Sequence, residues 1–177
     1  MTSKKILKIR KDSISIKRFA ITYLILMSIF FLLIGLKPVQ KIMDLNGLYT
    51  DGVVKVTAKI LGIAGIPCIY KDSIIQMPSI ALDVRFGCNG LEAVMIYSVA
   101  VIAFPSSWHK KLIGIIAGFL ILQVINILRI AALAYSGIYL DGLFEYIHIY
   151  VAQGIMIAIS LSIFFIYLNY ARKTSRA

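Results

Sequence analysis

Acidic residues, cysteines and histidines are all scarce in this sequence of 177 residues. Eight Asp and Glu residues stand against 19 Lys and Arg residues, and there are two cysteines and two histidines. No CxxC motif is present, and one Cys, one His and one Glu give too few ligands for a recognised zinc spacing. We therefore expect neither a metal nor another cofactor. Cys68 and Cys88 could form a disulfide, although their spacing does not show that they do.

Charge is also scarce in four long apolar runs, whose only charged residues are Glu92 and Arg129, and this argues against a soluble domain. The chain is 60% hydrophobic with a mean hydropathy of +0.88, and a soluble protein of this size would alternate more. A helix needs about 20 residues to cross a bilayer core. The runs cover 19–36, 87–104, 112–135 and 147–170. The sequence predicts an all-α integral membrane protein with about four transmembrane helices.

The net charge of +11 follows the sides of the membrane and does not indicate nucleic-acid binding. With four crossings, the two ends and the loop 105–111 fall on one side, where 12 basic residues accompany one acidic residue. The other side holds six of each. Cytoplasmic segments carry the excess of Lys and Arg, so we expect a multi-pass protein of the cell (inner) membrane with both termini in the cytoplasm. Membrane lipid is an expected partner and nucleic acid is not.

The first run is expected to stay as an anchor, because it is too long for a signal peptide and Lys37-Pro38-Val39 does not resemble a cleavage site. About 50 residues follow it outside the membrane. Apolar residues between Val53 and Ala64, with Lys55 and Lys59 among them, fit an amphipathic interfacial helix. Alternating residues after it, separated by turn signals, predict a small β-hairpin.

These observations divide the chain into five parts. They are a basic cytoplasmic tail (1–18), an anchor helix (19–36), an extracytoplasmic segment (37–86), a three-helix membrane core that carries the site (87–171) and a second basic tail (172–177).

Cys88 lies where the extramembrane segment meets the second apolar run. If the run from Leu91 is helical, Cys88 is in or just before its first turn. There the unpaired N–H groups and the positive end of the helix dipole favour a thiolate. Gly87 and Gly90 would let another backbone approach the sulfur. A lone cysteine is more often a small packing residue, so its assignment depends on the residues around it.

Polar residues interrupt the third run at Gln123, Asn126 and Arg129. A charged side chain within a span costs on the order of 3 kcal/mol, so Arg129 needs a partner or a function. It lies about 9 Å before the end of the run at Tyr135, near the level of Cys88, and Asn126 shares its helix face. A structural alternative is an ion pair between Arg129 and Glu92.

Topology brings Cys88, Arg129 and His148 to one depth on the outer side of the membrane. His148 opens the fourth run, whereas the other histidine, His109, falls on the cytoplasmic side. A thiol, an imidazole and a guanidinium are the parts of a cysteine acyl-transfer site. Cys88 would attack a carbonyl, His148 would carry protons and Arg129 would hold negative charge, with the division of work between the last two left open.

At these residues the chain resembles the exosortase/archaeosortase family of integral membrane cysteine transpeptidases. The resemblance lies in Cys88-Asn89-Gly90 at a span start, Asn126-Ile127-Leu128-Arg129 within a later span and His148 at the beginning of the next. Gly65-Ile66-Pro67 is also similar to a segment that precedes the cysteine in that family. The chain is short for the family and resembles its compact exosortase H type, with Asn89 where many members have Ser.

The resemblance implies an enzyme that cleaves the C-terminal sorting signal of secreted proteins through a thioester on Cys88 and passes them to an acceptor. Such a signal has a short motif, a hydrophobic helix and a basic tail. The implied catalytic residues, facing outward, are Cys88, Arg129 and His148. The supporting residues are Asn126, Glu92, Asn89 and Gly90.

Two other functions are compatible with the residues. A membrane thiol oxidoreductase would use Cys68 and Cys88 together, whereas a transpeptidase needs only Cys88. A non-enzymatic assembly or transport component would use Arg129 and Glu92 as a buried ion pair.

Overall fold

The computed structural model describes residues 3–34, 36, 38–39, 47–84, 88–139, 142 and 144–173. Gly87 and the end of the C-terminal tail lie outside these residues. The helices are α1 (Ser3–Ile34), α3 (Leu48–Ile63), α4 (Leu91–Ala103), α5 (Trp108–Tyr139), α6 (Phe144–Tyr146), the π-helix η3 (Ile147–Ala152) and α7 (Gln153–Lys173). The strands are β1 (Ile69–Lys71), β2 (Ile74–Gln76) and β3 (Ala81–Asp83). The predicted all-α class is confirmed.

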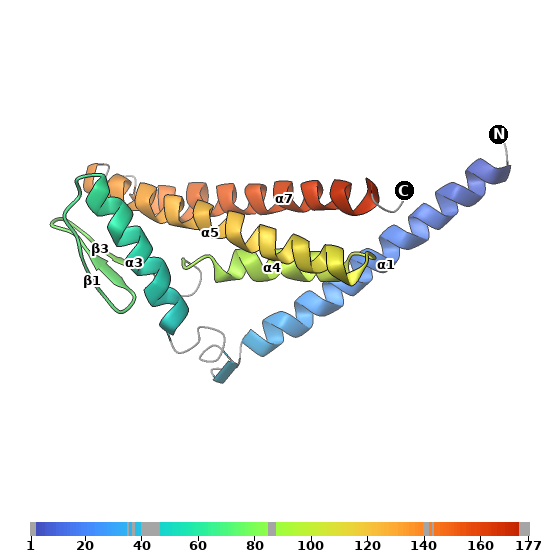
Figure 1. Ribbon diagram of the computed structural model, residues 1–177, viewed down its shortest axis with the longest axis horizontal. Coiled ribbons are helices and arrows are strands. Elements are labelled where there is room, and N and C mark those ends of the chain that lie inside the picture. The colour runs from blue at the N-terminus through green and yellow to red at the C-terminus, as the bar shows by residue number, and fades with distance from the viewer. Residues whose placement is uncertain are drawn as a thin grey trace.

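Helices α4, α5 and α7 run side by side and form the bundle (Figure 1). Glycines let α5 approach its neighbours closely. A Cβ at Gly118 would overlap the Tyr97 ring, and one at Gly114 would lie 2.6 Å from the Tyr167 ring. Tyr97 also donates a hydrogen bond to the carbonyl of Gly114 at 2.9 Å. Small residues and interhelical hydrogen bonds hold helices together where lipid removes the hydrophobic driving force.

Among the described residues, three helices are long and apolar enough to cross a membrane: Ile16–Leu33 within α1, the whole of α5, and Tyr150–Arg172. The second expected span differs, because α4 has only 13 residues. It measures about 20 Å at 1.5 Å per residue, against about 30 Å for a bilayer core. The turn that precedes α4 therefore lies beside the bundle helices rather than at the level of their ends.

A second layer, formed by α3 and the sheet, covers one end of the bundle (Figure 1). The sheet is antiparallel in the order β1-β2-β3, so the expected hairpin is present and a third strand extends it. The core of this layer combines Val54 and Leu61 of α3, Ile75 of β2, and Ile130 and Ala134 of α5. The amphipathic helix thus packs its apolar face against the sheet and α5.

The opposite face of α3 is exposed and carries two lysines beside apolar side chains, among them Val56 and Ile63. Lys55 and Lys59 are exposed, and Lys55 forms a salt bridge with Asp51 at 2.6 Å. The hydrogen bond to Asp51 raises the pKa of Lys55 above its usual value. This division into two faces is what the sequence pattern predicts for the helix.

Most of helix α1 is not packed against the bundle. Only 6% of its segment Ile16–Leu33 is buried. Its Phe19 ring stacks on Phe164 and meets Phe104 edge-on, with ring centroids 6.0 and 6.1 Å apart. Figure 1 shows α1 crossing the bundle near the end of α4 and diverging from it elsewhere. The helix is continuous across residue 18, where the tail was expected to meet the anchor.

Candidate active site

The segment Cys88-Asn89-Gly90 forms the turn that leads into α4. Gly90 is the N-cap residue and has a φ of 79°, in the left-handed region that favours glycine. The side-chain oxygen of Asn89 accepts a hydrogen bond from the backbone N–H of Leu91 at 3.1 Å. Cys88 therefore lies just before the helix start, as the sequence predicts.

Asn89 holds this turn against α3. Its side chain is fully buried, and its amide nitrogen donates to the hydroxyl of Thr50 at 3.1 Å. The Tyr49 hydroxyl donates to the carbonyl of Asn89 at 3.4 Å. The layer formed by α3 and the sheet thus holds Asn89, the residue next to Cys88, in place.

His148 reaches Cys88 from the wide turn η3. The distance between Cys88 Sγ and His148 Nε2 is 3.2 Å, which allows a hydrogen bond between the thiol and the imidazole. The His148 ring lies parallel to that of Phe144, with centroids 5.9 Å apart and planes 11° apart. Phe144 in turn packs close to Gly137 of α5. A π-helical turn is rare in proteins and is often found at functional sites.

Arg129 reaches the same turn from α5. Its Nη2 donates a hydrogen bond to the backbone carbonyl of Cys88 at 3.2 Å. Its Nε is buried and has no hydrogen-bond partner within the described part of the chain. The guanidinium is therefore held through Nη2, while its Nε is enclosed by the surrounding side chains.

Asn126 of α5 packs against the turn Cys88-Asn89-Gly90 at Gly90. It is fully buried, and a Cβ built on Gly90 would lie 2.6 Å from its Cγ. Neither of its amide atoms has a hydrogen-bond partner among the described residues, and the same holds for Gln123. Gln123, Asn126 and Arg129 follow one another at three-residue intervals, so they form a polar row along one face of α5.

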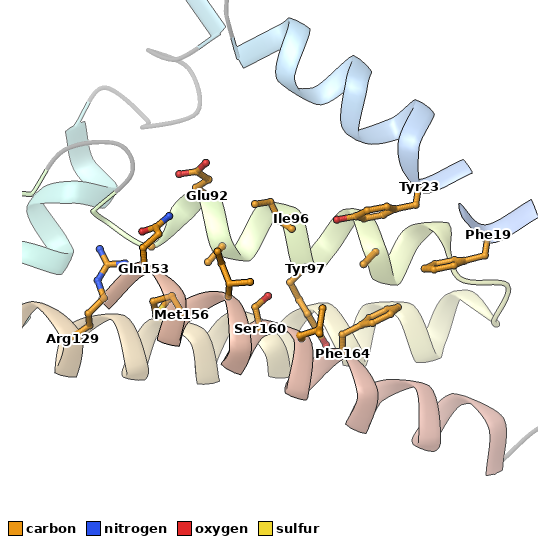
Figure 2. A pocket seen from close by; sticks show the side chains of 15 residues that line it. Phe19, Tyr23, Glu92, Ile96, Tyr97, Arg129, Gln153, Met156, Ser160 and Phe164 are labelled. Carbon is orange, nitrogen blue, oxygen red and sulfur yellow. The ribbon is translucent and has the colours of Figure 1, made fainter. Parts of the chain in front are cut away.

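Glu92 does not form a salt bridge with Arg129 in the described part of the structure. Both residues instead line a cavity of about 380 Å³ beside α4 (Figure 2). The ion pair that the sequence offers as a structural alternative is therefore not formed among the described residues.

Cys68 and His109 lie apart from this cluster. Both cysteines are free, and the Cys68 thiol donates to the carbonyl of Ala58 at 3.5 Å beside the core of α3 and the sheet. His109 is exposed at the start of α5, about 30 Å along that helix from Arg129. Within the described residues no group of three or more His, Cys, Asp and Glu side chains could hold a metal ion.

The structure adds residues that sequence reasoning missed. Phe144 precedes His148 by four positions, a spacing that places side chains together on a helix and could have indicated the contact. Thr50 and Tyr49 gave no such signal, because they meet Asn89 only through tertiary packing. Gln153, at the start of α7, lines the cavity with Arg129 and Glu92.

Comparison with known proteins gives one family. The model of a family described as transmembrane exosortase matches residues 14–167, a range that includes Cys88, Arg129 and His148. No curated protein and no solved structure matches the chain.

Proposed function

The chain belongs to the transmembrane exosortase family, and on this premise we propose that it is a cysteine transpeptidase that cleaves the C-terminal sorting signal of secreted proteins. The supporting observation is the 3.2 Å distance between Cys88 Sγ and His148 Nε2. It joins a nucleophile to a base within hydrogen-bond reach, which is the arrangement that activates a cysteine.

In the first step, Nε2 of His148 takes the proton of the Cys88 thiol while the sulfur attacks the carbonyl carbon of the scissile peptide bond. Collapse of the tetrahedral intermediate breaks the C–N bond, and the imidazolium gives its proton to the departing amine. The products are a thioester on Cys88 and the released C-terminal part of the signal. In the second step, an acceptor nucleophile loses its proton to His148 and attacks the thioester, which restores the thiol.

Arg129 supplies positive charge to this chemistry. Its hydrogen bond to the Cys88 carbonyl fixes the guanidinium beside the nucleophile, where its positive charge can stabilise the oxyanion of the intermediate. Donors fixed in a site that excludes water stabilise such charge more strongly than they would in water. This role accounts for an arginine in an apolar helix, where it otherwise costs on the order of 3 kcal/mol.

The site lies within the outer half of the membrane in this proposal. The distribution of Lys and Arg places the ends of the chain and the loop 105–111 in the cytoplasm. Arg129 lies ten positions before the end of α5 at Tyr139, or about 15 Å along the helix. The core 87–171 carries the chemistry, residues 37–86 cover its outer side, and residues 19–36 anchor the chain.

Expression with a substrate tests the proposal. The substrate is a secreted protein whose tail has a short motif, an apolar helix and a basic end, and cleavage is followed by its size on a gel. Cys88→Ala should lower the cleavage rate by about 10³-fold or more, because it removes the nucleophile. A thioester adduct of mass equal to the acyl part should appear on the wild-type protein alone.

Cys68→Ser is the matched control and should cleave as the wild type does, because Cys68 contacts only the core of α3 and the sheet. Equal loss in both variants would favour the thiol oxidoreductase. Unchanged cleavage by Cys88→Ala would contradict the proposed cysteine mechanism.

A further inference from the structure

The cavity beside α4 is a groove that runs along the bundle from the turn Cys88-Asn89-Gly90. Arg129 lies at one end, and Phe19, Tyr23 and Phe164 line the other (Figure 2). Gly90 of the turn also lines the groove, and Arg129 donates a hydrogen bond to the carbonyl of Cys88, so the groove reaches the turn that carries Cys88.

The groove is long enough to receive part of a helix. It follows α4 from Gly90 to Ala100, which is about 15 Å at 1.5 Å per residue. On the facing wall it follows α7 from Gln153 to Phe164. About ten residues of a helix laid along it would contact both walls.

Polarity changes along the groove. Glu92, Arg129 and Gln153 gather at the end near Cys88, whereas the rest of the lining is mostly apolar (Figure 2). Backbone groups outside a helix need hydrogen-bond partners at membrane depth, and these three side chains could supply them. The arrangement suits a peptide that is extended at the site and helical farther along. A phospholipid, whose ester and phosphate groups could use the same side chains, is the competing occupant.

Helix α1 closes one end of the groove and leaves its side open. It meets α4 and α7 through Phe19, and the rest of it diverges from the bundle (Figure 1). An apolar helix moving within the bilayer could enter between α1 and the bundle without leaving the lipid.

We infer that this groove, walled by α4 and α7 and closed by α1, binds the apolar helix that follows the scissile bond, with the bond itself held at Arg129. The inference rests on the proposed function and adds to it the place and direction of the substrate. It also gives α1 a role in substrate binding beyond anchoring.

Crosslinking tests the occupant without requiring catalysis. Ile157 lines the groove and is 60% exposed, whereas Ile166 does not line it and is 69% exposed. The two lie nine positions apart on α7, on opposite faces of the helix. A photoreactive phenylalanine analogue is placed at each position in the Cys88→Ala protein, in membranes that contain the substrate.

The substrate helix should crosslink from position 157 and not from position 166. Equal crosslinking from both positions, or crosslinks from 157 to lipid alone, would overturn the inference. Because Cys88→Ala does not cleave, this result is independent of whether the proposed reaction occurs.

A bulky side chain in the groove gives a second measurement. Ile157→Trp should lower kcat/KM for the membrane-bound substrate by about tenfold, since an overfilled contact weakens binding of the helix. The rate of Cys88 alkylation by a small reagent should stay unchanged, because the cluster itself is intact. Ile166→Trp is the control and should match the wild type. If Ile157→Trp cleaves normally while Cys88→Ala does not, the groove assignment fails and the transpeptidase assignment stands.

Discussion

Cys88 has two neighbours that contribute different chemistry. His148 Nε2 faces its sulfur at 3.2 Å, whereas Arg129 binds its carbonyl oxygen. The imidazole is therefore placed to exchange a proton with the thiol, and the guanidinium holds the backbone of Cys88 in place. The sequence leaves open how His148 and Arg129 share the work. In the structure, His148 lies at the side chain of Cys88 and Arg129 lies at its backbone carbonyl.

The two histidines of the chain make a direct comparison possible. His148→Ala should lower the cleavage rate by about 10²- to 10⁴-fold, the usual contribution of a general base. It should also slow alkylation of Cys88 at neutral pH. His109→Ala should change neither quantity, since His109 is exposed at the far end of α5. Normal cleavage by His148→Ala would exclude it as the base.

Two glycines with the same backbone conformation allow the cost of a left-handed backbone to be measured apart from the cost of a side-chain overlap. Gly65 and Gly90 have φ values of 80° and 79°, but only at Gly90 would a Cβ meet another side chain, that of Asn126. Gly65→Ala should cost about 1 kcal/mol of stability for the left-handed backbone. Gly90→Ala should cost about 1–3 kcal/mol more for the overlap.

Thermal unfolding in detergent measures both variants. Adding Asn126→Ala to Gly90→Ala should recover part of the difference, because it removes the atoms that the new methyl group would meet. Equal melting temperatures for the two single variants would show that the turn does not rest on Asn126.

At the scale of elements, η3 decides where His148 points. A π-helix holds one more residue per turn than the α-helix into which it leads. Deleting Tyr150 should convert this turn to α-helix and rotate His148 by about 100° relative to α7. Cleavage should then be lost while the helix content by circular dichroism is kept.

Tyr150→Ala is the matched control, because it removes the same exposed side chain and keeps the residue count. It should cleave as the wild type does. A deletion variant with full activity would show that the site tolerates either register.

Helix α4 is the other element that shapes the site. Its 13 residues are too few for a full crossing, so the cysteine turn lies deep beside α5 and α7. Asn89 then connects this turn to α3 through Thr50. The layer formed by α3 and the sheet therefore supports the turn that carries Cys88.

At the scale of the whole molecule, orientation remains a prediction from charge. Ser79, between β2 and β3, and Ser107, between α4 and α5, are both exposed serines in connecting segments. In a protein carrying Cys68→Ser and Cys88→Ala, Ser79→Cys should react with a membrane-impermeant maleimide in intact cells. Ser107→Cys should react only after the cells are permeabilised. The opposite pattern would place the site in the cytoplasm and contradict the proposed function.

The sequence determined the class of the molecule. Long apolar runs, an amphipathic segment and turn residues are local features, and they led to the membrane helices, α3 and the hairpin. The motifs around Cys88, Arg129 and His148 gave the resemblance to the family that the comparison then showed. Their catalytic roles remain predictions.

Only the tertiary structure decided how those residues meet. Cys88 and His148 are 60 positions apart in the chain, and no local pattern specifies a distance between them. The contact of Asn89 with Thr50, the parallel rings of Phe144 and His148, and the groove beside α4 all depend on how separate helices pack. Periodicity and charge act along the chain, whereas a site is formed by side chains from several elements whose relative positions packing alone determines.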